Sequence, residues 1–510
     1  MDCTIPRVRM LVAVAVTLAG CGGEQGVADA AAGMDAAMGG DGADGAAAPD
    51  AAADAAQDPC ADGCEGRRCG SVGTCGGTCG SAEPIAFEAS IPTQSLASME
   101  ATLHAKQEKI AVTSDGTIHL YLQLDTQGAA YARSHDGGAT WEAFQLLDER
   151  GWLGVIAADE GDDLHIIYAS SWREGNEYRS SPQAVTARVD RSADRWTWTW
   201  GQPTALLPHP PNPRHGFLDF ALDSQGTFHL VTASTEAFSF DAPDEPVRTG
   251  IHYFRSASPF DPSAFDPGEE LFSLEIWPVE VPGFALGYGG DPAVDVDGTG
   301  GVVLVYSDRS LYQSGLEQAQ WPDTGARGTL FVQRALPEAG SFSLTTARPV
   351  ARGVYGDADI LVDPDGTTHV VYTIVESGSS YRAAYRQIGP DDEMGPEVLL
   401  TERDPGQTER TIFPSLARLA DGSLVVALTD RLADPAGSLA ATVRPAGAPS
   451  FGCVVPLSNG PVGDVDANLL ASADGGMLRF VYLALADAAG EHRVQFGSLD
   501  ADRLKAASAR

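Results

Sequence analysis

Short apolar runs and tight polar turns alternate along most of the chain. From about residue 84 onward one unit recurs, consisting of an apolar run, a D-x-x-G turn and a second apolar run that often begins with His. Apolar runs joined by a tight glycine turn predict β-hairpins. The recurrences lie at 113–122, 159–168, 223–232, 295–306, 363–372, 419–428 and 472–482.

Weaker strand-like stretches follow most hairpins, such as 129–133 and 141–147. Four short antiparallel strands per unit are typical of the blades of a β-propeller. We therefore predict an all-β fold, a single β-propeller over residues 84–502, with seven four-stranded blades or, alternatively, six. A solenoid is less well supported, because its repeats usually span about 20–45 residues. The last unit ends after 492–499, so residues 84–91 are expected to supply its fourth strand, and 503–510 form a C-terminal tail.

The N-terminus has the layout of an export signal. Residues 1–20 combine a basic head, an apolar stretch and small residues at the end. The L-A-G-C sequence that ends at Cys21 resembles the lipobox of bacterial lipoproteins, which implies a signal peptide over 1–20 and lipidation of Cys21. Gly22 after the cysteine resembles the pattern that sorts lipoproteins to the outer membrane of Gram-negative bacteria. Residues 21–58 contain no basic and no aromatic side chain, which predicts a disordered tether.

A cysteine-rich stub over residues 59–83 follows the tether. So many cysteines in a short exported segment predict a module held together by disulfides. Zinc binding is the alternative, but the segment lacks paired C-x-x-C knuckles and histidines. The number of stub cysteines is odd, so either Cys453 forms a crosslink to the stub or two thiols stay free. The stub cysteines are Cys60, Cys64, Cys69, Cys75 and Cys79.

The charge balance excludes one class of function. The chain has 33 Lys and Arg residues against 70 Asp and Glu residues, a formal net charge of −37. Such a negative field repels phosphate backbones and anionic lipid, so nucleic acid is excluded as a partner. Contact with a membrane is expected through the lipid anchor alone, and the protein is expected to be a monomer.

The first unit contains the sequence SHDGGATW, which matches the S-x-D-x-G-x-T-W pattern of an Asp-box. On these residues the repeat region resembles the sialidase-like, Asp-box (BNR-repeat) β-propellers. In that family the box lies away from the active site, which implies that it stabilises the fold and has no catalytic role. The matching residues are Ser134, Asp136, Gly138, Thr140 and Trp141.

Carboxylates recur at the start of the predicted innermost strands. Counting back seven residues from each turn position gives Lys109, Val155, Asp219, Asp291, Asp359, Ser415 and Asn468, and Asp357 and Asp466 lie close by. If these side chains converge on the channel, their oxygens would suit Ca²⁺ or sugar hydroxyls. The alternative is that they cap strands and bond neighbouring amides. No cofactor is required by any pattern in the chain.

Four histidines share another repeat position, on the second strand of the hairpin. Because that strand does not line the channel, we expect them to bond within their own blades and not to bind a metal together. They are His119, His165, His229 and His369.

The sialidase catalytic pattern is incomplete. Ile412 occupies the arginine position of the family's F/Y-R-I-P motif, and Arg410 lies two residues earlier, about 7 Å away along a strand. Tyr288 and Tyr355 precede inner strands, where each could act as a nucleophile or stacking platform, or simply pack. Two hypotheses follow: a surface lipoprotein that binds a glycan or a protein, and a carbohydrate-active enzyme, a glycosidase or lyase, that uses carboxylates near the channel.

Overall fold

The structure is a computed structural model. It describes residues 69, 85–93, 108–125, 127–174, 177–192, 195–206, 213–236, 247–259, 261, 265–266, 268–276, 292–307, 328–338, 341–375, 381–401, 414–430, 438–458, 468–471, 476–485 and 492–509. The signal sequence, the tether and several predicted site residues lie outside these ranges. Those residues are Cys21, Cys60, Cys64, Cys75, Cys79, Tyr288, Asp291, Arg410 and Asp466.

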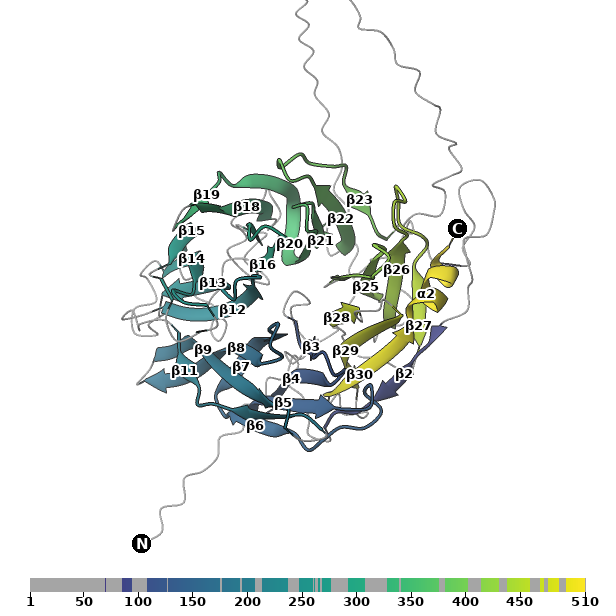
Figure 1. Ribbon diagram of the computed structural model, residues 1–510. Coiled ribbons are helices and arrows are strands. Elements are labelled where there is room, and N and C mark those ends of the chain that lie inside the picture. Colours follow the sequence, from purple (N-terminus) through teal and green to yellow (C-terminus); the bar gives the residue numbers. More distant parts are fainter. Residues whose placement is uncertain are drawn as a thin grey trace, which may run out of the picture. The chain divides into compact units, whose positions relative to one another are not determined.

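Each of the recurrent sequence units forms an antiparallel hairpin. The first strand of each hairpin is the innermost of its unit (Figure 1). The hairpins are β3 (Ile110–Val112) with β4 (Ile118–Leu124), β7 (Gly151–Ala158) with β8 (Leu164–Glu174), β12 (Pro213–Leu222) with β13 (Phe228–Glu236), β16 (Ala293–Val296) with β17 (Val302–Ser307), β20 (Arg348–Val362) with β21 (Thr368–Val375), β24 (Ser415–Arg418) with β25 (Leu424–Asp430), and β28 (Asn468–Ala471) with β29 (Met477–Leu485).

The D-x-x-G turn forms through local hydrogen bonds. In the third unit, Asp223 Oδ1 accepts the backbone N–H groups of Gln225 and Thr227, each at 2.8 Å. Gly226 adopts φ 80°, a left-handed conformation that glycine reaches at low cost. The other carboxylate oxygen lies 3.2 Å from His229 Nε2, so one aspartate ties the turn to the strand that follows it.

The remaining strands pair outward from the hairpins and complete an all-β domain. They are β5 (Gly128–Ser134), β6 (Gln145–Asp148), β9 (Glu177–Asp190), β10 (Thr197–Trp200), β11 (Thr204–Ala205), β14 (Val247–Arg255), β15 (Glu269–Ile276), β18 (Gly328–Glu338), β19 (Ser341–Leu344), β22 (Tyr381–Ile388), β23 (Val398–Leu399), β26 (Ser438–Arg444), β27 (Val455–Ser458) and β30 (His492–Asp500).

The strands of the described residues form five hydrogen-bonded sheets, so the prediction of seven, or six, separate four-stranded sheets is wrong. Two of the sheets each join two sequence units. β12 pairs in parallel with β9 at Arg214 and Ser180, which links the second unit to the third. β20 is one continuous strand whose first part pairs with β18 and whose last part pairs with β21. Long strands that serve two units therefore merge sheets that the repeat pattern separates.

The innermost strands contact one another in a circle, from β3 through β7, β12, β16, β20, β24 and β28 back to β3. Figure 1 shows these strands around the axis of the domain, with the later strands of each unit outside them. The fold is therefore a β-propeller arrangement.

Two short strands from the N-terminal end of the domain pair with its last two units. β2 (Glu88–Ser90) pairs antiparallel with β30, as expected for residues 84–91, and β1 (Ile85–Ala86) pairs in parallel with β27. Phe87 between them is 7% exposed and meets Phe480 edge-on, with ring centroids 4.8 Å apart. Burial of this aromatic side chain stabilises the closed ring.

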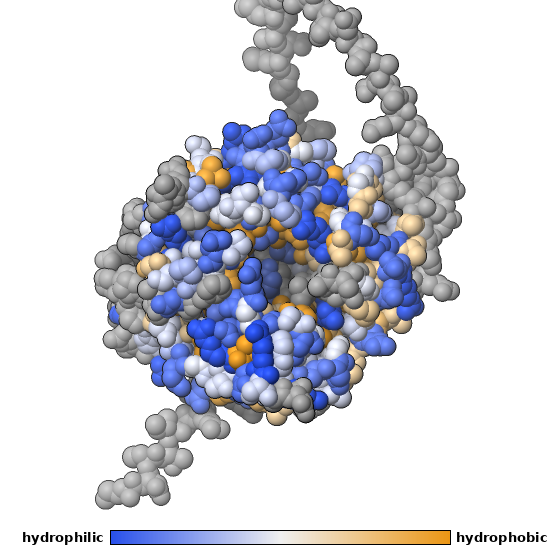
Figure 2. Space-filling view, in the orientation of Figure 1, coloured by the Kyte–Doolittle hydropathy of each residue, from blue (hydrophilic) through white to orange (hydrophobic). Residues whose placement is uncertain are grey.

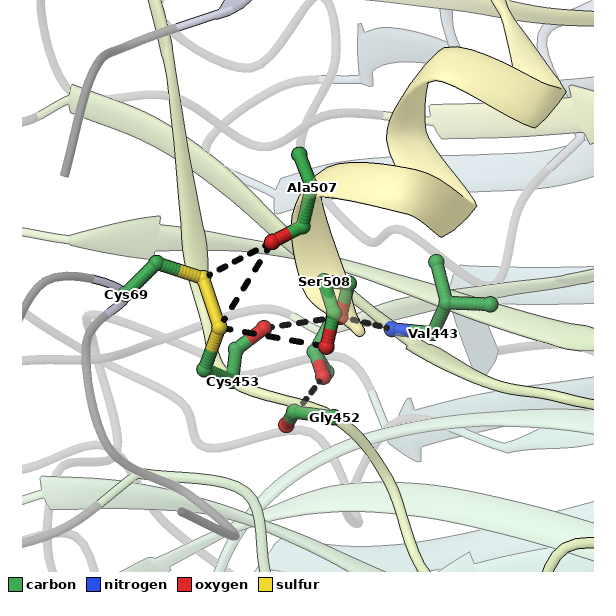
Figure 3. The surroundings of a disulfide bond; sticks show 7 residues. Cys69, Val443, Gly452, Cys453, Ala507 and Ser508 are labelled. Atoms are coloured by element: carbon green, nitrogen blue, oxygen red, sulfur yellow. Dashed lines mark hydrogen bonds between the residues drawn. A yellow bond between two sulfur atoms is a disulfide. The ribbon is translucent and has the colours of Figure 1, made fainter. Parts of the chain in front are cut away.

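The predicted C-terminal tail lies mostly in a helix, α2 (Ala501–Ser508). Asp500 caps it by accepting the N–H of Arg503 at 2.9 Å, and Leu504 is fully buried. A disulfide joins Cys69 to Cys453 beneath this helix, across 384 residues of sequence, and the Ala507 carbonyl lies within 3.7 Å of both sulfurs (Figure 3). The stub is thus crosslinked to the propeller.

Buried tyrosines fill the space between neighbouring units. Each lies on the second strand of a hairpin and is at most 2% exposed, and the phenolic tip of Tyr372 donates a 2.6 Å hydrogen bond to Glu397. The tyrosines are Tyr121, Tyr168, Tyr306, Tyr372 and Tyr482. The part of the chain that the structure describes holds no helix long and apolar enough to cross a membrane.

Candidate functional site at the propeller axis

The aligned repeat position occupies one level of the innermost strands. Asp219 pairs with Val231 and Asp359 pairs with Val371, each two residues after the histidine of its unit. The equivalent register positions in three other units are Val155, Ser415 and Asn468. In the first unit the position is Lys109, whose carbonyl accepts the N–H of Tyr121. The sequence alignment therefore identified a real structural position in these units.

The fourth unit departs from the alignment. Counting from Gly298 selects Asp291, but the turn closes at Gly300, which has φ 84° and donates its N–H to the Asp297 carbonyl. The equivalent position is therefore Ala293, which pairs with Val305. Overlapping D-V-D-G and D-G-T-G sequences hide this two-residue difference from sequence analysis.

The aspartates at this level hold neighbouring units together. Asp219 Oδ2 accepts the N–H of Val294 at 2.8 Å, and Asp359 Oδ2 accepts the N–H of Leu416 at 2.7 Å. In both cases the amide belongs to the innermost strand of the next unit. These contacts match the strand-capping alternative that the sequence left open, because the carboxylates bond backbone amides.

Asp295 lies on β16, two residues after Ala293, and sequence analysis did not select it. Like Asp219 and Asp359, it bonds a backbone amide of the next unit. Its Oδ2 accepts the N–H of Val362 at 2.6 Å. Burial raises the pKa of Asp295 to about 6 and that of Asp359 to about 7. The hydrogen bonds from backbone amides act in the opposite direction and lower both pKa values, but burial is the larger effect. These carboxyl groups therefore titrate close to neutral pH.

Glu108, two residues before β3, is the second axial acid that sequence analysis missed. The residue is partly exposed, unlike the buried Asp219 and Asp359. Burial, followed by the negative charges of Asp219, Asp359 and Asp295, raises its pKa well above the usual range. The sequence signal that could have identified Glu108 is its place directly before Lys109, the residue at the aligned position. Figure 2 shows that the face in view is hollowed at its centre.

Lys109 follows Glu108 and turns into the core. Its side chain is 1% exposed, and the ammonium group donates to the Gly154 carbonyl and lies 5.2 Å from the centroid of the Tyr121 ring. The lysine thus links the first unit to the second and is shielded from the channel.

The described residues contain no group of three or more His, Cys, Asp or Glu side chains placed to hold a metal ion. At Asp219 and Asp359, an oxygen that a cation would use already accepts a backbone N–H. One carboxylate oxygen of each residue is therefore engaged by the protein itself.

Two other candidate residues are placed by the backbone alone. Tyr355 and Asp357 lie on β20, in the irregular stretch between Val354 and Ala358 where the pairing with β21 shifts register. This stretch directly precedes the level of Asp359.

The Asp-box forms the predicted network in the loop after β5. Ser134 Oγ accepts the N–H of Gly138 at 2.9 Å, and Asp136 Oδ1 accepts the N–H of Thr140 at 2.8 Å. The hydrogen bond from the Thr140 hydroxyl, with the others around it, lowers the pKa of Asp136 to about 2. Trp141 packs against Phe496 of the last unit, with centroids 5.2 Å apart. The box therefore stabilises the junction between the first and last units.

The repeated histidines bond within their blades. His229 Nδ1 lies 2.8 Å from the Tyr253 hydroxyl, and its Nε2 faces the turn aspartate Asp223. His369 repeats the arrangement with Tyr385 and Asp363, at 2.7 Å and 3.3 Å. For His119, burial lowers the pKa to about 3, so it stays neutral. These contacts fit a structural role.

No family model and no curated protein matches the chain. Among solved structures, it is similar to an ulvan lyase described as a new family of polysaccharide lyase (9% identity, 83% of this chain, 100% of that chain, TM-score 0.49). It is also similar to a Hadza microbial sialidase (11%, 74% and 74%, 0.41) and to an α-L-arabinanase from Penicillium chrysogenum (14%, 70% and 94%, 0.40).

Proposed function

We propose that the propeller is a carbohydrate-active enzyme, a glycosidase in which Glu108 donates the proton. The observation that supports this function is Glu108, a partly exposed residue whose carboxyl pKa is raised well above its usual range by burial and by three neighbouring carboxylates. A carboxyl group with a raised pKa can act as a general acid.

The charge of the site favours a neutral polysaccharide as substrate. Glu108, Asp219, Asp295 and Asp359 are all acidic, and the negative charge of the aspartates that helps to raise the pKa of Glu108 would also disfavour an anionic sugar. Glycosidic bond cleavage develops positive charge on the sugar ring, which nearby carboxylates stabilise. A neutral substrate and a cationic transition state both suit an acidic enclosure.

The test compares Glu108→Gln with Glu160→Gln, a change at an exposed turn residue. Both variants are assayed for new reducing ends on arabinan, xylan and mannan. We expect hydrolysis of at least one polymer, unchanged in Glu160→Gln and reduced about 100-fold or more in Glu108→Gln, because general acid catalysis contributes about 10²–10⁴-fold. Equal activity of the two variants would remove Glu108 as the acid.

Binding without turnover is the second candidate. It is favoured because backbone amides already bond the carboxylates of Asp219, Asp295 and Asp359. Among these residues, each acid that could act as the partner of Glu108 is therefore engaged in a structural hydrogen bond. A glycan array with the same protein tests this function. Retention of a neutral glycan that the protein does not cleave would support binding and refute the glycosidase.

Further proposals rest on sequence. We propose that Cys21 is lipidated and that the protein is anchored to the outer membrane or cell surface of a Gram-negative bacterium. Labelled palmitate incorporated into the wild-type protein, and lost in Cys21→Ala, would support the anchor, and equal labelling of both would refute it.

A further inference from the structure

A second cavity lies away from the propeller axis, between the end of β2 and the Asp-box loop. Its volume is about 530 Å³, within the range of about 300–1,000 Å³ that is usual for small-molecule sites. It is lined by Ser90, Ile91, Pro92, Thr93, Ala139, Thr140, Trp141, Glu142, Ala143 and Phe144. We call it the Asp-box cavity.

The apolar part of the wall is unusual for an exposed surface. Trp141 and Phe144 are half-buried, and Ile91 is 40% exposed. Within the part of the chain that the structure describes, three large hydrophobic residues are classed as exposed; one is Ile91, and a second, Leu146, follows Phe144 by two residues. Trp141 and Phe144 thus pack against the core of the first and last units and also line the cavity, where a ligand could contact them.

The wall is also held rigidly. Ser90 Oγ donates a 2.6 Å hydrogen bond to the Gly138 carbonyl and accepts the Trp141 Nε1–H at 2.8 Å. Phe496 supports the indole, and Asp136 holds the turn that precedes it. Aromatic side chains fixed in this way lose little conformational entropy when a ligand binds.

The polar part of the wall suits hydroxyl groups. The Glu142 carboxylate is exposed and bonded to Arg133 at 2.7 Å and to His135 at 3.2 Å, which fixes its orientation and leaves lone pairs as acceptors. Thr140 adds a hydroxyl group at the rim. A sugar presents apolar C–H faces to aromatic rings and hydroxyls to such acceptors.

We propose that the Asp-box cavity is a second binding site for a neutral oligosaccharide. The carboxylate of Glu142 and the chain's net charge of −37 disfavour anionic sugars. A peptide that adds to the sheet edge is disfavoured, because β2 has three residues and Pro92 beyond it lacks an N–H donor. This site is independent of the function proposed for Glu108.

The experiment is calorimetric titration of the full chain with cellohexaose, xylohexaose and mannohexaose, with hexagalacturonate as the anionic comparison. It is carried out in Glu108→Gln, so that cleavage at the axis does not contribute. We expect saturable binding of at least one neutral hexasaccharide and at least tenfold weaker binding when Phe144→Ala is added. Leu336→Ala is the matched control, because Leu336 is 43% exposed and is not among the cavity residues.

Ile91→Ser provides a second variant if Phe144→Ala fails to fold, and it should also weaken binding. The proposal is overturned if no neutral hexasaccharide binds, if hexagalacturonate binds as tightly, or if both cavity variants bind like the Leu336→Ala control. Loss of cleavage in Glu108→Gln with binding retained in the cavity separates this site from the axial one.

Discussion

Asp359→Asn tests the role of the axial carboxylates in stability. Asp359 is 5% exposed and accepts the Leu416 N–H, and asparagine keeps both the size and an acceptor oxygen for that bond. The substitution therefore removes the ability to ionise with little change in packing.

The magnitude follows from the pKa. Burial raises the pKa of Asp359 from 3.8 to about 7 in the folded protein, which corresponds to roughly 4 kcal/mol at about 1.4 kcal/mol per pH unit. A raised folded-state pKa stabilises the protein fully below about pH 4, and this contribution is lost as the pH rises through about 7. Asp295, with a pKa of about 6, acts in the same direction.

Urea unfolding followed by intrinsic fluorescence measures the free energy of unfolding from pH 5 to pH 8. Asp359→Asn should gain stability relative to the wild type as the pH rises, by roughly 3 kcal/mol between pH 5 and pH 8, because about two pH units of the shift lie in that range. Asp365→Asn is the control, because hydrogen bonds from Thr367 lower the pKa of this exposed turn residue. A difference between Asp359→Asn and the wild type that stays flat or shrinks with pH would refute the reasoning.

Three further predictions concern the ring. Replacing Cys69 and Cys453 by alanine should lower the melting temperature. The free energy of unfolding should fall by up to about 6 kcal/mol for a 384-residue loop, and by less to the extent that β1 and β2 already close the ring. An unchanged melting curve would contradict this. In urea unfolding, Gly138→Ala should destabilise the protein by about 1–3 kcal/mol more than Gly137→Ala. Of these two positions, only at Gly138 would a Cβ atom meet a neighbour, the Phe496 ring at 2.2 Å. Equal losses in the two variants would contradict the clash. By the same measurement, Phe87→Ala should lower the free energy of unfolding by about 3–5 kcal/mol, and the control Glu88→Ala, at an exposed residue, by about 0.5 kcal/mol or less. A small loss at Phe87 would mean that the N-terminal strands add little to the stability of the closed ring.

Much of the local structure could be predicted because its causes lie within a few residues. In the third unit, an aspartate that accepts the amides two and four residues later and a glycine with positive φ determine the turn, as at Asp223 and Gly226. The Asp-box network from Ser134 to Trp141 is equally local. The all-β class, the hairpin positions and the use of residues 84–91 therefore followed from the sequence.

Contacts between distant units decided the rest. Asp219 is committed to a hydrogen bond by Val294, 75 residues later, so its sequence alone could not distinguish a channel ligand from a strand cap. The continuity of β20 reduced the number of sheets, and the overlap of two turn sequences placed Ala293, not Asp291, at the aligned level. The raised pKa of Glu108 depends on carboxylates from three other units. The local pattern determined which residues form each unit, and the packing of units around the axis determined what their carboxylates can do, because burial and charge depend on neighbours that only the closed ring brings together.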